Sequence, residues 1–519
     1  MMAVWSEGYF TDVEYSNYYF RELSPLFLNL NLTLAGYDIP RGGDNICPPK
    51  DFSYLELAFG CGGSINVHAA TTNGKFVGTD FNPTQVAIAR DYAVVDNVTL
   101  YDDSFKQLLE RLEANRAEFD YIVFHGIFSW ISQENRDTIL EIVKKFLKVG
   151  GVVYNSYNCM PGWSAKAPSR EILGLYKELY GSAEMDTQGL VKNALGFFED
   201  FLSINPTFIL SSPQNKELLQ ELKDKDSSYI SHEYFNQNWD CFYFYQVAKM
   251  MERAKCSFAV SAECLDHFDS LNVRPEWAEF FSKIKNRIFK EQLKDYCANR
   301  QFRRDIYIKG GKKIGKNEGE RRLMYSEFML VDLPSKFSDT LKCVAGEMTL
   351  NKDLYQSVLK HLQTDSYRPK TIKEIMEKTN LTFSIVIEAL MLLIQQGIVF
   401  PSQPVTEEIK TKAKAYNNNV LSKLVNDGSH NYLVAPAIAS ATITTTSVEQ
   451  IILYAFSQGI KKESELINYT LKIFKEQNRG FIKNGKVLEK ESDNKEAIKE
   501  VAKEFLKKIP LYQALGVLE

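Results

Sequence analysis

The sequence lacks a long apolar run, a paired set of cysteines and an excess of charge of either sign. No apolar stretch approaches the roughly 20 residues of a membrane-spanning helix, so we expect no stable membrane insertion. The first ten residues contain no basic region followed by an apolar segment, which argues against a secretory signal. The 62 Lys and Arg residues balance 66 Asp and Glu residues, for a net charge of -4, whereas a nucleic-acid-binding protein usually carries a marked basic excess. These absences predict a cytoplasmic protein without a nucleic-acid partner.

The eight cysteines stand far apart and include no Cys-x-x-Cys pair. Eight cysteines in a chain of 519 residues do not make a disulfide scaffold. We therefore expect reduced thiols and no bound metal.

Short apolar runs alternate with helical stretches from residue 52 onward, which is typical of a parallel sheet in an α/β fold. The expected strands are 52–57, 76–79, 98–101, 121–124 and 152–154. Residues 160–300 have a mostly helical pattern with many Phe and Tyr. Two further runs, 305–308 and 325–333, alternate as strands around a Gly- and Lys-rich loop, and we expect them to form a hairpin that completes the sheet.

The length suggests roughly three or four domains at about 100–200 residues per domain. We predict a doubly wound, Rossmann-like sheet with a large helical insertion and a helical, winged-helix-like C-terminal region. The expected parts are an N-terminal lid or substrate segment (1–50), a ligand-binding core (51–160), a helical insertion (161–304), the hairpin (305–335), a winged-helix-like middle region (336–403) and a C-terminal helical region (404–519).

The strongest local signal is a glycine turn between the first strand and its helix. Residues 55–63 read LELAFGCGG, and Asp80 follows Gly60 by twenty residues, at the end of the second strand. Such a turn lets the backbone approach a nucleotide-like ligand closely, and an acid at that spacing can accept both ribose hydroxyls. The alternative is a pair of loop glycines between packed elements.

The acids around this turn favour a ligand without phosphate. No third glycine completes the dinucleotide pattern, and Glu56 at the strand end would repel a phosphate but suits a cation. S-adenosylmethionine carries a sulfonium, an amino group and a ribose, and no phosphate. Asp103 after the third strand could take the adenine amino group while Phe105 stacks on the ring. Three acids at neighbouring strand ends suit one ligand across the switch point of a doubly wound sheet.

Several motifs together resemble one family. LELAFGCGGSINVHAA (55–70), GTDFNP (78–83) and HGIFSWI (125–131) are similar to class I S-adenosylmethionine-dependent methyltransferases of the branch that carries a methyltransferase regulatory domain. GGVVYNSYNCMPGW (150–163), SHEYFNQNWDCFYFY (231–245) and DYCANRQFRRD (295–305) also match, so the resemblance covers roughly residues 15–310. Ala58 stands where the branch usually has glycine, and alanine suits that position only if its φ is negative.

The resemblance implies a cofactor, S-adenosylmethionine, with S-adenosylhomocysteine as its product. The candidate cofactor contacts are Glu56, Ala58, Gly60, Gly62, Asp80, Phe81, Asp103, Ser104, Phe105, His125 and Gly126. Within the branch, the chain looks most similar to the rickettsial protein-lysine methyltransferases that modify outer-membrane protein B. That likeness implies lysine N-methylation of a bacterial outer-membrane protein and a dimerisation region, so we expect a homodimer with the insertion in the contact.

The acceptor side of the site is less defined by the sequence. His125 could be a general base, or a neutral histidine that orients the cofactor or fills the strand end. Tyr154, Asn155, Tyr157 and Asn158 follow the fifth strand and could align an amine, although core packing would equally explain the tyrosines. The candidate substrate contacts are Tyr15, Tyr18, Tyr19 and Trp130. Methylation of a small molecule, or a non-catalytic cofactor-binding scaffold, are the alternative functions.

Three arginines near the end of the insertion have two possible roles. Arg300, Arg303 and Arg304 could bind an acidic partner, but ion pairs that anchor the insertion to the core are the favoured interpretation. The segment 383–396 in the middle region is too apolar for a DNA recognition helix, which needs polar or basic side chains.

Overall fold

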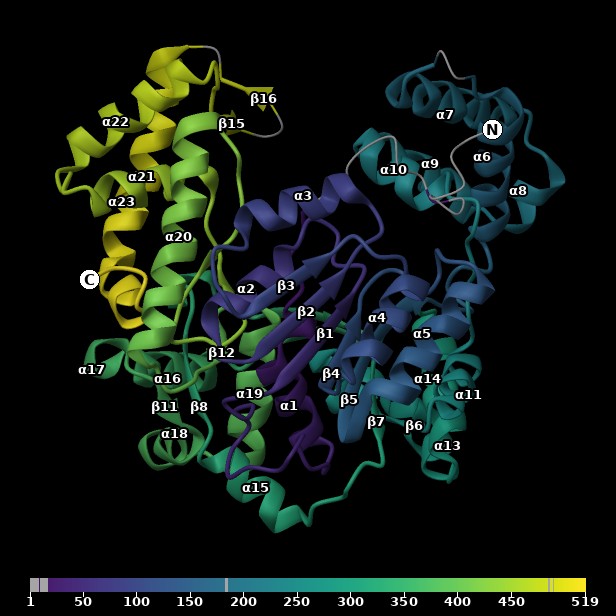
Figure 1. Ribbon diagram of the computed structural model, residues 1–519, viewed down its shortest axis with the longest axis horizontal. Coiled ribbons are helices and arrows are strands. Elements are labelled where there is room, and N and C mark those ends of the chain that lie inside the picture. The colour runs from purple at the N-terminus through teal and green to yellow at the C-terminus, as the bar shows by residue number, and fades with distance from the viewer. Residues whose placement is uncertain (1–8, 10–16, 183–184, 484–485, 489) are drawn as a thin grey trace.

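A computed structural model describes residue 9 and residues 17–182, 185–483, 486–488 and 490–519. A central sheet carries two lobes, one built from the helical insertion and one from the C-terminal helices (Figure 1). Among the described residues, no helix combines the length and the apolar character needed to cross a membrane.

The sheet has seven strands in the order β3-β2-β1-β4-β5-β7-β6. The first five strands are parallel, whereas β7 runs antiparallel to both of its neighbours. This topology confirms the predicted Rossmann-like α/β fold. The strand bounds are β1 Ser53–Leu57, β2 Lys75–Thr79, β3 Val98–Tyr101, β4 Phe119–Phe124, β5 Leu147–Asn158, β6 Cys256–Ser261 and β7 Phe302–Lys309.

Apolar side chains cover both faces of the sheet, so its strands read as continuous apolar runs instead of alternating ones. In β4, Tyr121 and Val123 face one core with α1, α2 and α3, while Ile122 and Phe124 face the other with α4, α5 and α11. The helix bounds are α1 Pro25–Leu34, α2 Gly63–Thr71, α3 Pro83–Tyr92, α4 Phe105–Asn115, α5 Gln133–Phe146 and α11 Phe244–Arg253. Local caps set several of these starts; Ser104, for example, forms a capping box with Gln107 at α4.

The first part of the insertion, residues 163–241, folds around a core of its own, whereas α11 packs against the sheet. Leu173, Phe198 and Tyr234 lie in one buried apolar cluster that is separate from the clusters on the sheet. The further elements of the insertion are α6 Ala167–Tyr180, α7 Thr187–Ser203, α8 Thr207–Ser211, α9 Gln214–Lys223, α10 Ser227–Tyr234, η3 Cys264–His267, α12 Asp269–Asn272, η4 Pro275–Trp277, α13 Ala278–Ser282 and α14 Arg287–Ala298. The short strand β6 was not predicted from its pattern; it becomes a strand because the edge of β7 is there to pair with it.

The predicted hairpin over 305–335 is wrong. β7 has its two edges occupied by β5 and β6, so no edge is left for the next strand. β8 (Glu327–Leu330) pairs instead with β11 (Lys370–Thr371) and β12 (Val399–Pro401) in a separate three-stranded sheet. The expected loop before β8 contains a helix, α15 (Lys316–Met324).

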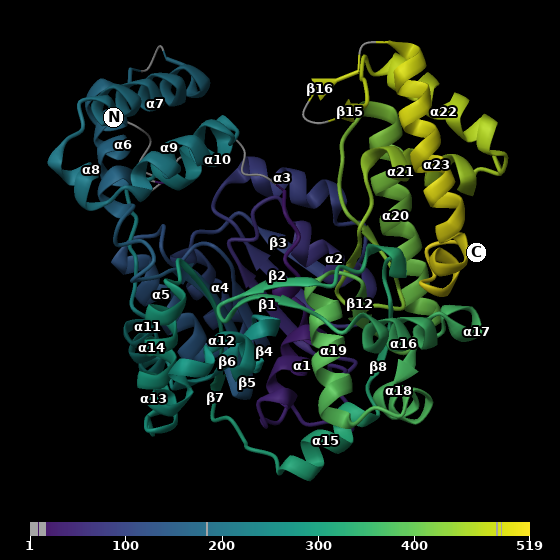
Figure 2. The same ribbon diagram turned by 180° about the vertical axis from the view of Figure 1, so that it is seen from behind.

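The middle region combines that small sheet with several helices. α19 is almost fully apolar and packs beside α1 in the largest apolar core, as Figure 2 shows from behind. The remaining bounds are η5 Pro334–Lys336, β9 Thr340–Cys343, β10 Gly346–Thr349, α16 Lys352–Leu362, α17 Thr364–Tyr367, α18 Ile372–Thr379 and α19 Phe383–Gln395.

The C-terminal lobe is helical and shares the largest core with α1 and α19. Ahead of the sheet, the short η2 (Arg21–Leu23) leads into α1. The bounds within the lobe are α20 Glu407–Asp427, β13 Leu433–Val434, β14 Thr442–Ile443, α21 Ser447–Ser457, α22 Glu463–Glu476, β15 Ile482–Lys483, β16 Lys486–Val487 and α23 Glu491–Ala514.

Ion pairs anchor the end of the insertion to the sheet. The buried guanidinium of Arg303 contacts Asp295 of α14 at 2.5 Å and Asp305 of its own strand at 2.9 Å. The hydroxyl of Tyr157 donates to Asp305 at 2.5 Å from the neighbouring strand β5. Arg300 pairs with Asp266 at 2.9 Å. These arginines are therefore engaged inside the molecule, as the anchoring interpretation expects.

Asp305→Ala should destabilise the protein strongly, because it leaves the Arg303 guanidinium buried with one carboxylate fewer. We expect a loss of about 3–5 kcal/mol in the free energy of unfolding, measured in urea by tryptophan fluorescence. The control is Asp137→Ala, which removes an exposed pair with Arg253 and should cost less than about 1 kcal/mol. Equal losses in both variants would contradict this role of the buried pair.

Candidate functional site

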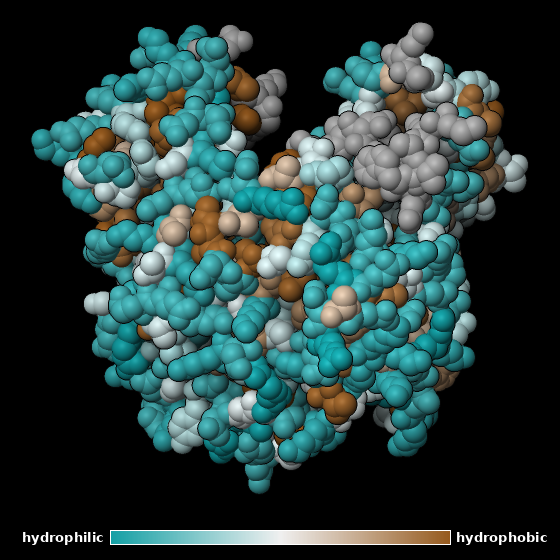
Figure 3. All heavy atoms as spheres, in the orientation of Figure 1, coloured by the Kyte–Doolittle hydropathy of each residue, from teal (hydrophilic) through white to brown (hydrophobic). Residues whose placement is uncertain are grey.

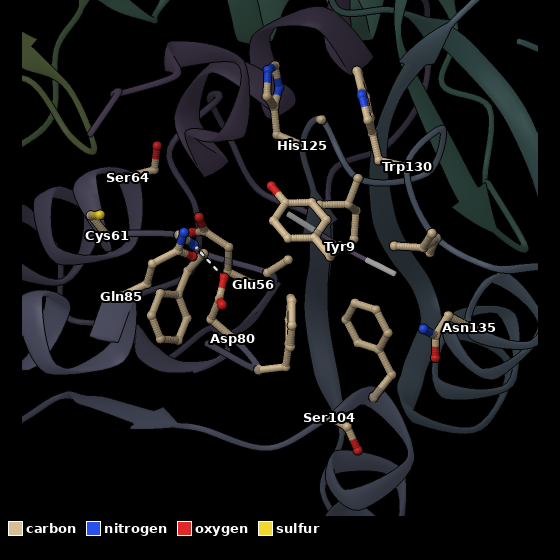
Figure 4. Close-up of a pocket in the computed structure, with 18 of the residues that line it drawn as sticks. Tyr9, Glu56, Cys61, Ser64, Asp80, Gln85, Ser104, His125, Trp130 and Asn135 are labelled. Carbon is tan, nitrogen blue, oxygen red and sulfur yellow. Dashed lines mark hydrogen bonds between the residues drawn. The ribbon is translucent and has the colours of Figure 1, made fainter. Parts of the chain in front are cut away.

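One pocket lies at the carboxyl ends of β1, β2, β3 and β4 (Figure 4). Residues of the N-terminal segment and Asn238 of the insertion also line it. Among the sequence-predicted residues it brings together Glu56, Ala58, Gly60, Asp80, Phe81, Asp103, Ser104, Phe105, His125, Gly126, Tyr18 and Trp130. Parallel strands end on one edge of a sheet, so residues far apart in the chain meet there.

The glycine turn is built for close approach. Gly60 has φ +59° and Gly126 has φ +64°, and a side chain added at either would meet open space, so backbone faces the pocket at both. Gly62 lies behind the turn, where an added Cβ would lie 2.6 Å from the Cβ of Ala89. The glycine at 62 is therefore required by helix packing, while those at 60 and 126 leave room for a ligand.

Ala58 adopts φ +55°, against the expectation that an alanine there needs a negative φ. Its backbone N–H donates to the carbonyl of Thr79 on β2 at 2.7 Å. This hydrogen bond between neighbouring strand ends holds the residue in the left-handed region, at a cost of about 1–2 kcal/mol for a side chain with a Cβ.

Two carboxylates at the pocket are deeply buried. Asp80 accepts the backbone N–H of Gly60 at 2.9 Å and that of Asn82 at 3.0 Å, and burial raises its pKa to about 7. Burial also raises the pKa of Glu56 to about 8, although the Tyr54 hydroxyl donates to it. Within the described part of the chain, no lysine, arginine or histidine forms an ion pair with either carboxylate. A cationic or hydroxyl-rich ligand would supply the missing partners.

The third acid is already engaged. Asp103 receives two hydrogen bonds from the guanidinium of Arg111, at 2.5 and 3.0 Å, and Arg111 lies over the ring of Tyr101. The pair fixes the carboxylate at the rim of the pocket beside Phe105. Asp103 retains free acceptor capacity, because a carboxylate has about four lone-pair sites.

His125 is held as a neutral ring. Its imidazole stacks on Phe20 with ring centres 3.7 Å apart, and its Nδ1 shares a hydrogen bond of 2.8 Å with the Tyr154 hydroxyl. Burial lowers its pKa well below the usual value, and the positive charge of Arg304 acts in the same direction. Of the two roles that the sequence leaves open, this environment favours the neutral, orienting histidine over the base.

The four residues at the end of β5 lie behind the pocket, since none of them is among its described lining residues. Tyr157 donates to Asp305, and the Asn158 amide donates to Glu233 of α10 at 3.3 Å. Asn155 is fully buried, and Tyr154 reaches the site only through His125. Tyr154 enters the apolar core on one face of the sheet and Tyr157 the core on the other, so a place for these residues beside the methyl position stays a prediction.

The aromatic residues of the N-terminal segment divide between two environments. Tyr18 lines the pocket, whereas the hydroxyl of Tyr19 points away from it and donates to the Ser440 carbonyl at 2.7 Å. Tyr15 falls outside the described residues. Tyr19 is therefore not placed as a substrate contact.

Several lining residues were missed by sequence reasoning. Tyr9 lies among the labelled side chains of Figure 4, with its ring 5.6 Å from Phe81 and 5.7 Å from His232 of α10. The many aromatic residues among the first twenty were a signal for Tyr9 and Phe20, but no local pattern marks the others. The missed residues are Tyr9, Asn17, Phe20, Leu23, Phe59, Cys61, Ser64, Gln85, Ile127, Ile131, Ser132, Asn135 and Asn238.

Comparison with known proteins agrees with this geometry. A family model described as a methyltransferase domain matches residues 57–153, and one described as a predicted methyltransferase regulatory domain matches residues 226–309. The chain is 32% identical to the uncharacterized protein sll1526 of Synechocystis over 99% of both chains. It is 32% identical to the uncharacterized protein RP028 of Rickettsia prowazekii, over 40% of this chain and 82% of that one.

The fold also has a solved counterpart. PKMT2 from Rickettsia typhi in complex with AdoHcy superposes with a TM-score of 0.66 at 19% identity, over 96% of this chain and 98% of that one. The fold and site thus define an S-adenosylmethionine-dependent methyltransferase with a Rossmann-like core. More narrowly, the chain belongs to the family of these enzymes in which a regulatory domain follows the methyltransferase domain.

Asp80→Ala should weaken binding of S-adenosylhomocysteine by roughly two orders of magnitude or more, because two charge-assisted hydrogen bonds would be lost. Isothermal titration calorimetry measures the change. The control is Asp102→Ala, an exposed acid near the same edge that pairs only with Arg90 among the described residues and should bind as the unaltered protein does. Unchanged affinity in a folded Asp80→Ala variant would contradict the assignment.

Binding of S-adenosylmethionine should strengthen as the pH rises from 6 to 8. Burial raises the pKa of Glu56 from 4.5 to about 8 and that of Asp80 from 3.8 to about 7, so the ligand-free site holds protons that a cationic ligand must displace. We expect affinity on the order of tenfold lower at pH 6 than at pH 8, with proton release seen by calorimetry in buffers of different ionisation enthalpy.

The same shifts act with the opposite sign on the ligand-free protein. A raised pKa makes the folded state bind more protons than the unfolded state, so this contribution to stability is lost as the pH rises from about 4.5 through about 8. Glu56→Gln should flatten both trends. A pH profile of binding that is unchanged in that variant would refute the role given to Glu56.

Proposed function

We propose that the pocket holds S-adenosylmethionine and that the enzyme N-methylates lysine side chains of a bacterial outer-membrane protein. When bound, this cofactor supplies an electrophilic methyl group on a positively charged sulfur. Asp80 would accept the ribose hydroxyls, and Glu56 would face positive charge. Phe81 and Phe105 offer aromatic surfaces for the base, with Asp103 as an acceptor at its edge. The open space over Gly60 and Gly126 fits that ligand, and so do the two buried carboxylates, which form no ion pair with any described residue.

The choice of a macromolecular acceptor rests on the broad surface around the pocket. Figure 3 shows a hollow between the insertion lobe and the C-terminal lobe. Asn238 of the insertion lines the pocket itself. A small acceptor needs only a pocket, whereas a protein segment needs a broad surface around it. The full-length similarity of fold to PKMT2 from Rickettsia typhi supports the same proposal.

The chemistry asks the site to receive an uncharged amine. A lysine with a pKa near 10.4 is neutral in about one molecule in a thousand at pH 7.4, a cost of ~4 kcal/mol. Trp130 and Tyr18 give the pocket an aromatic wall that disfavours the ammonium form by desolvation. The neutral ring of His125 is held in place by Phe20 and Tyr154, so it can orient the bound ligand without adding a positive charge. We further propose that the enzyme works in the cytoplasm, on a protein that has not yet been exported.

Incubation with methyl-labelled S-adenosylmethionine and a bacterial outer-membrane protein fraction tests this proposal. We expect label in the acid-precipitated protein, as methyl-lysine on amino-acid analysis, and none with Asp80→Ala. Label confined to the supernatant would favour the small-molecule alternative. No transfer by a protein that binds the cofactor would favour the scaffold.

We also propose a homodimer that uses the insertion lobe. Some of its aromatic residues, including Phe198 and Tyr234, fill the core of the lobe and are not available for a partner. Others remain outside: Leu179 is 70% exposed and Tyr180 is 66% exposed at the end of α6. Further exposed apolar residues on α6, α7 and α8 or beside them are Leu175, Phe197, Ile204 and Leu210. Exposed apolar surface of this extent is typical of an interface.

Light scattering at micromolar concentration should show a species of twice the 59.4 kDa chain mass. Leu179→Asp should shift it to the monomer, because a charge in an apolar contact disfavours association. The matched control is Val149→Asp, an exposed apolar position on the sheet, which should leave the dimer intact. The proposal would be contradicted if the unaltered protein is a monomer, or if the Leu179→Asp variant remains a dimer.

A further inference from the structure

One wall of the cofactor pocket comes from the segment 17–20, before η2. Asn17, Tyr18 and Phe20 line the pocket, and the backbone N–H of Phe20 donates to the Ser64 hydroxyl of α2 at 3.1 Å. A Cβ added at Gly63 would lie 2.6 Å from the carbonyl oxygen of Tyr18. The wall thus packs directly on the first turn of α2, so closely that a residue with a Cβ would clash at position 63.

The outer side of this wall is held by the C-terminal lobe, more than 400 residues later in the chain. The Asn17 amide donates to the Asn431 side chain at 3.1 Å, and the Tyr19 hydroxyl donates to the Ser440 carbonyl at 2.7 Å. The Tyr432 hydroxyl donates to the Asn17 carbonyl at 3.4 Å. We call residues 431–440 the clasp.

The clasp is itself fixed from two sides. Within the lobe, Gln450 of α21 donates to the Asn431 carbonyl at 2.8 Å. Toward the methyltransferase core, the backbone N–H of Ser440 donates to the hydroxyl of Thr71, the last residue of α2, at 2.8 Å. The clasp therefore contacts the C-terminal end of α2, at Thr71, while the wall that it holds contacts the N-terminal end of α2, at Ser64.

We propose that the clasp positions the wall of the cofactor pocket, so that Tyr19 and Asn431 are positioning residues for cofactor binding and the C-terminal lobe sets cofactor affinity. Neither side chain lines the pocket among the described residues. They act through Asn17, Tyr18 and Phe20. Because coupling between two sites is reciprocal, cofactor binding in turn stabilises the clasp. The inference rests on the assignment of this pocket to the cofactor.

Two pairs of variants test the positioning role in the full-length protein. Tyr19→Phe and Asn431→Ala each remove a hydrogen bond from the clasp to the wall, and each should weaken S-adenosylhomocysteine binding about fivefold by calorimetry. Tyr512→Phe and Asn494→Ala are the matched controls, since they remove hydrogen bonds inside the C-terminal lobe. Tyr512 donates to Glu449, and Asn494 accepts the backbone N–H of Phe481. The controls should lower the thermal unfolding temperature without changing the affinity.

Hydrogen exchange on the unaltered protein gives a second readout that needs no substitution. Addition of S-adenosylhomocysteine should slow amide exchange in 431–440 as well as at α2. Unchanged affinity in folded clasp variants, equal weakening in the controls, or no change of exchange in 431–440 would overturn the proposal. Full affinity in Asp80→Ala would instead show that the pocket assignment has failed.

Discussion

The site depends on the burial of two carboxylates at the ends of adjacent parallel strands. Asp80 accepts the backbone N–H of Gly60, and this hydrogen bond joins the end of β2 to the turn after β1. The strained φ of Ala58 and the exposed backbone at Gly60 belong to the same turn. Burial keeps the pKa of Glu56 and Asp80 high. The ligand-free protein carries this electrostatic cost, and a cationic, hydroxyl-bearing cofactor relieves it.

The walls around these carboxylates come from the N-terminal segment, the methyltransferase core and the insertion. His125 follows β4, Asn238 follows α10 in the insertion, and Phe20 precedes η2. Each wall is held from behind by a different neighbour: Tyr154 of β5 for His125 and the C-terminal lobe for the segment 17–20. The methyltransferase core thus carries the pocket, the insertion adds Asn238 to its lining, and the C-terminal lobe contacts the segment 17–20 from outside.

The ion pairs of Arg303 show how the insertion remains attached to that core. β7 closes the sheet after the insertion, and Arg303 on it contacts Asp295 of the insertion's last helix. Tyr157, on β5, donates to the same network through Asp305. A residue that sequence reasoning places beside the substrate therefore joins the insertion to the sheet. Hydrogen bonding of its hydroxyl to a buried aspartate explains why a tyrosine, and not phenylalanine, stands at this position.

The sequence alone determined the parallel core and the residues at the centre of the pocket, because strand, glycine turn and acid follow one another at short, regular spacing. Glu56, Gly60 and Asp80 were predictable for that reason, and all three meet in the pocket. Only the tertiary structure decided that β8 leaves the sheet, that β6 joins it and that Tyr154 to Asn158 lie behind the site. Strand order depends on which edges are free, and side-chain direction depends on the layers packed above and below. The hydrogen bonds of Asn17 and Tyr19 to the clasp likewise span more than 400 residues, a separation at which no local pattern operates.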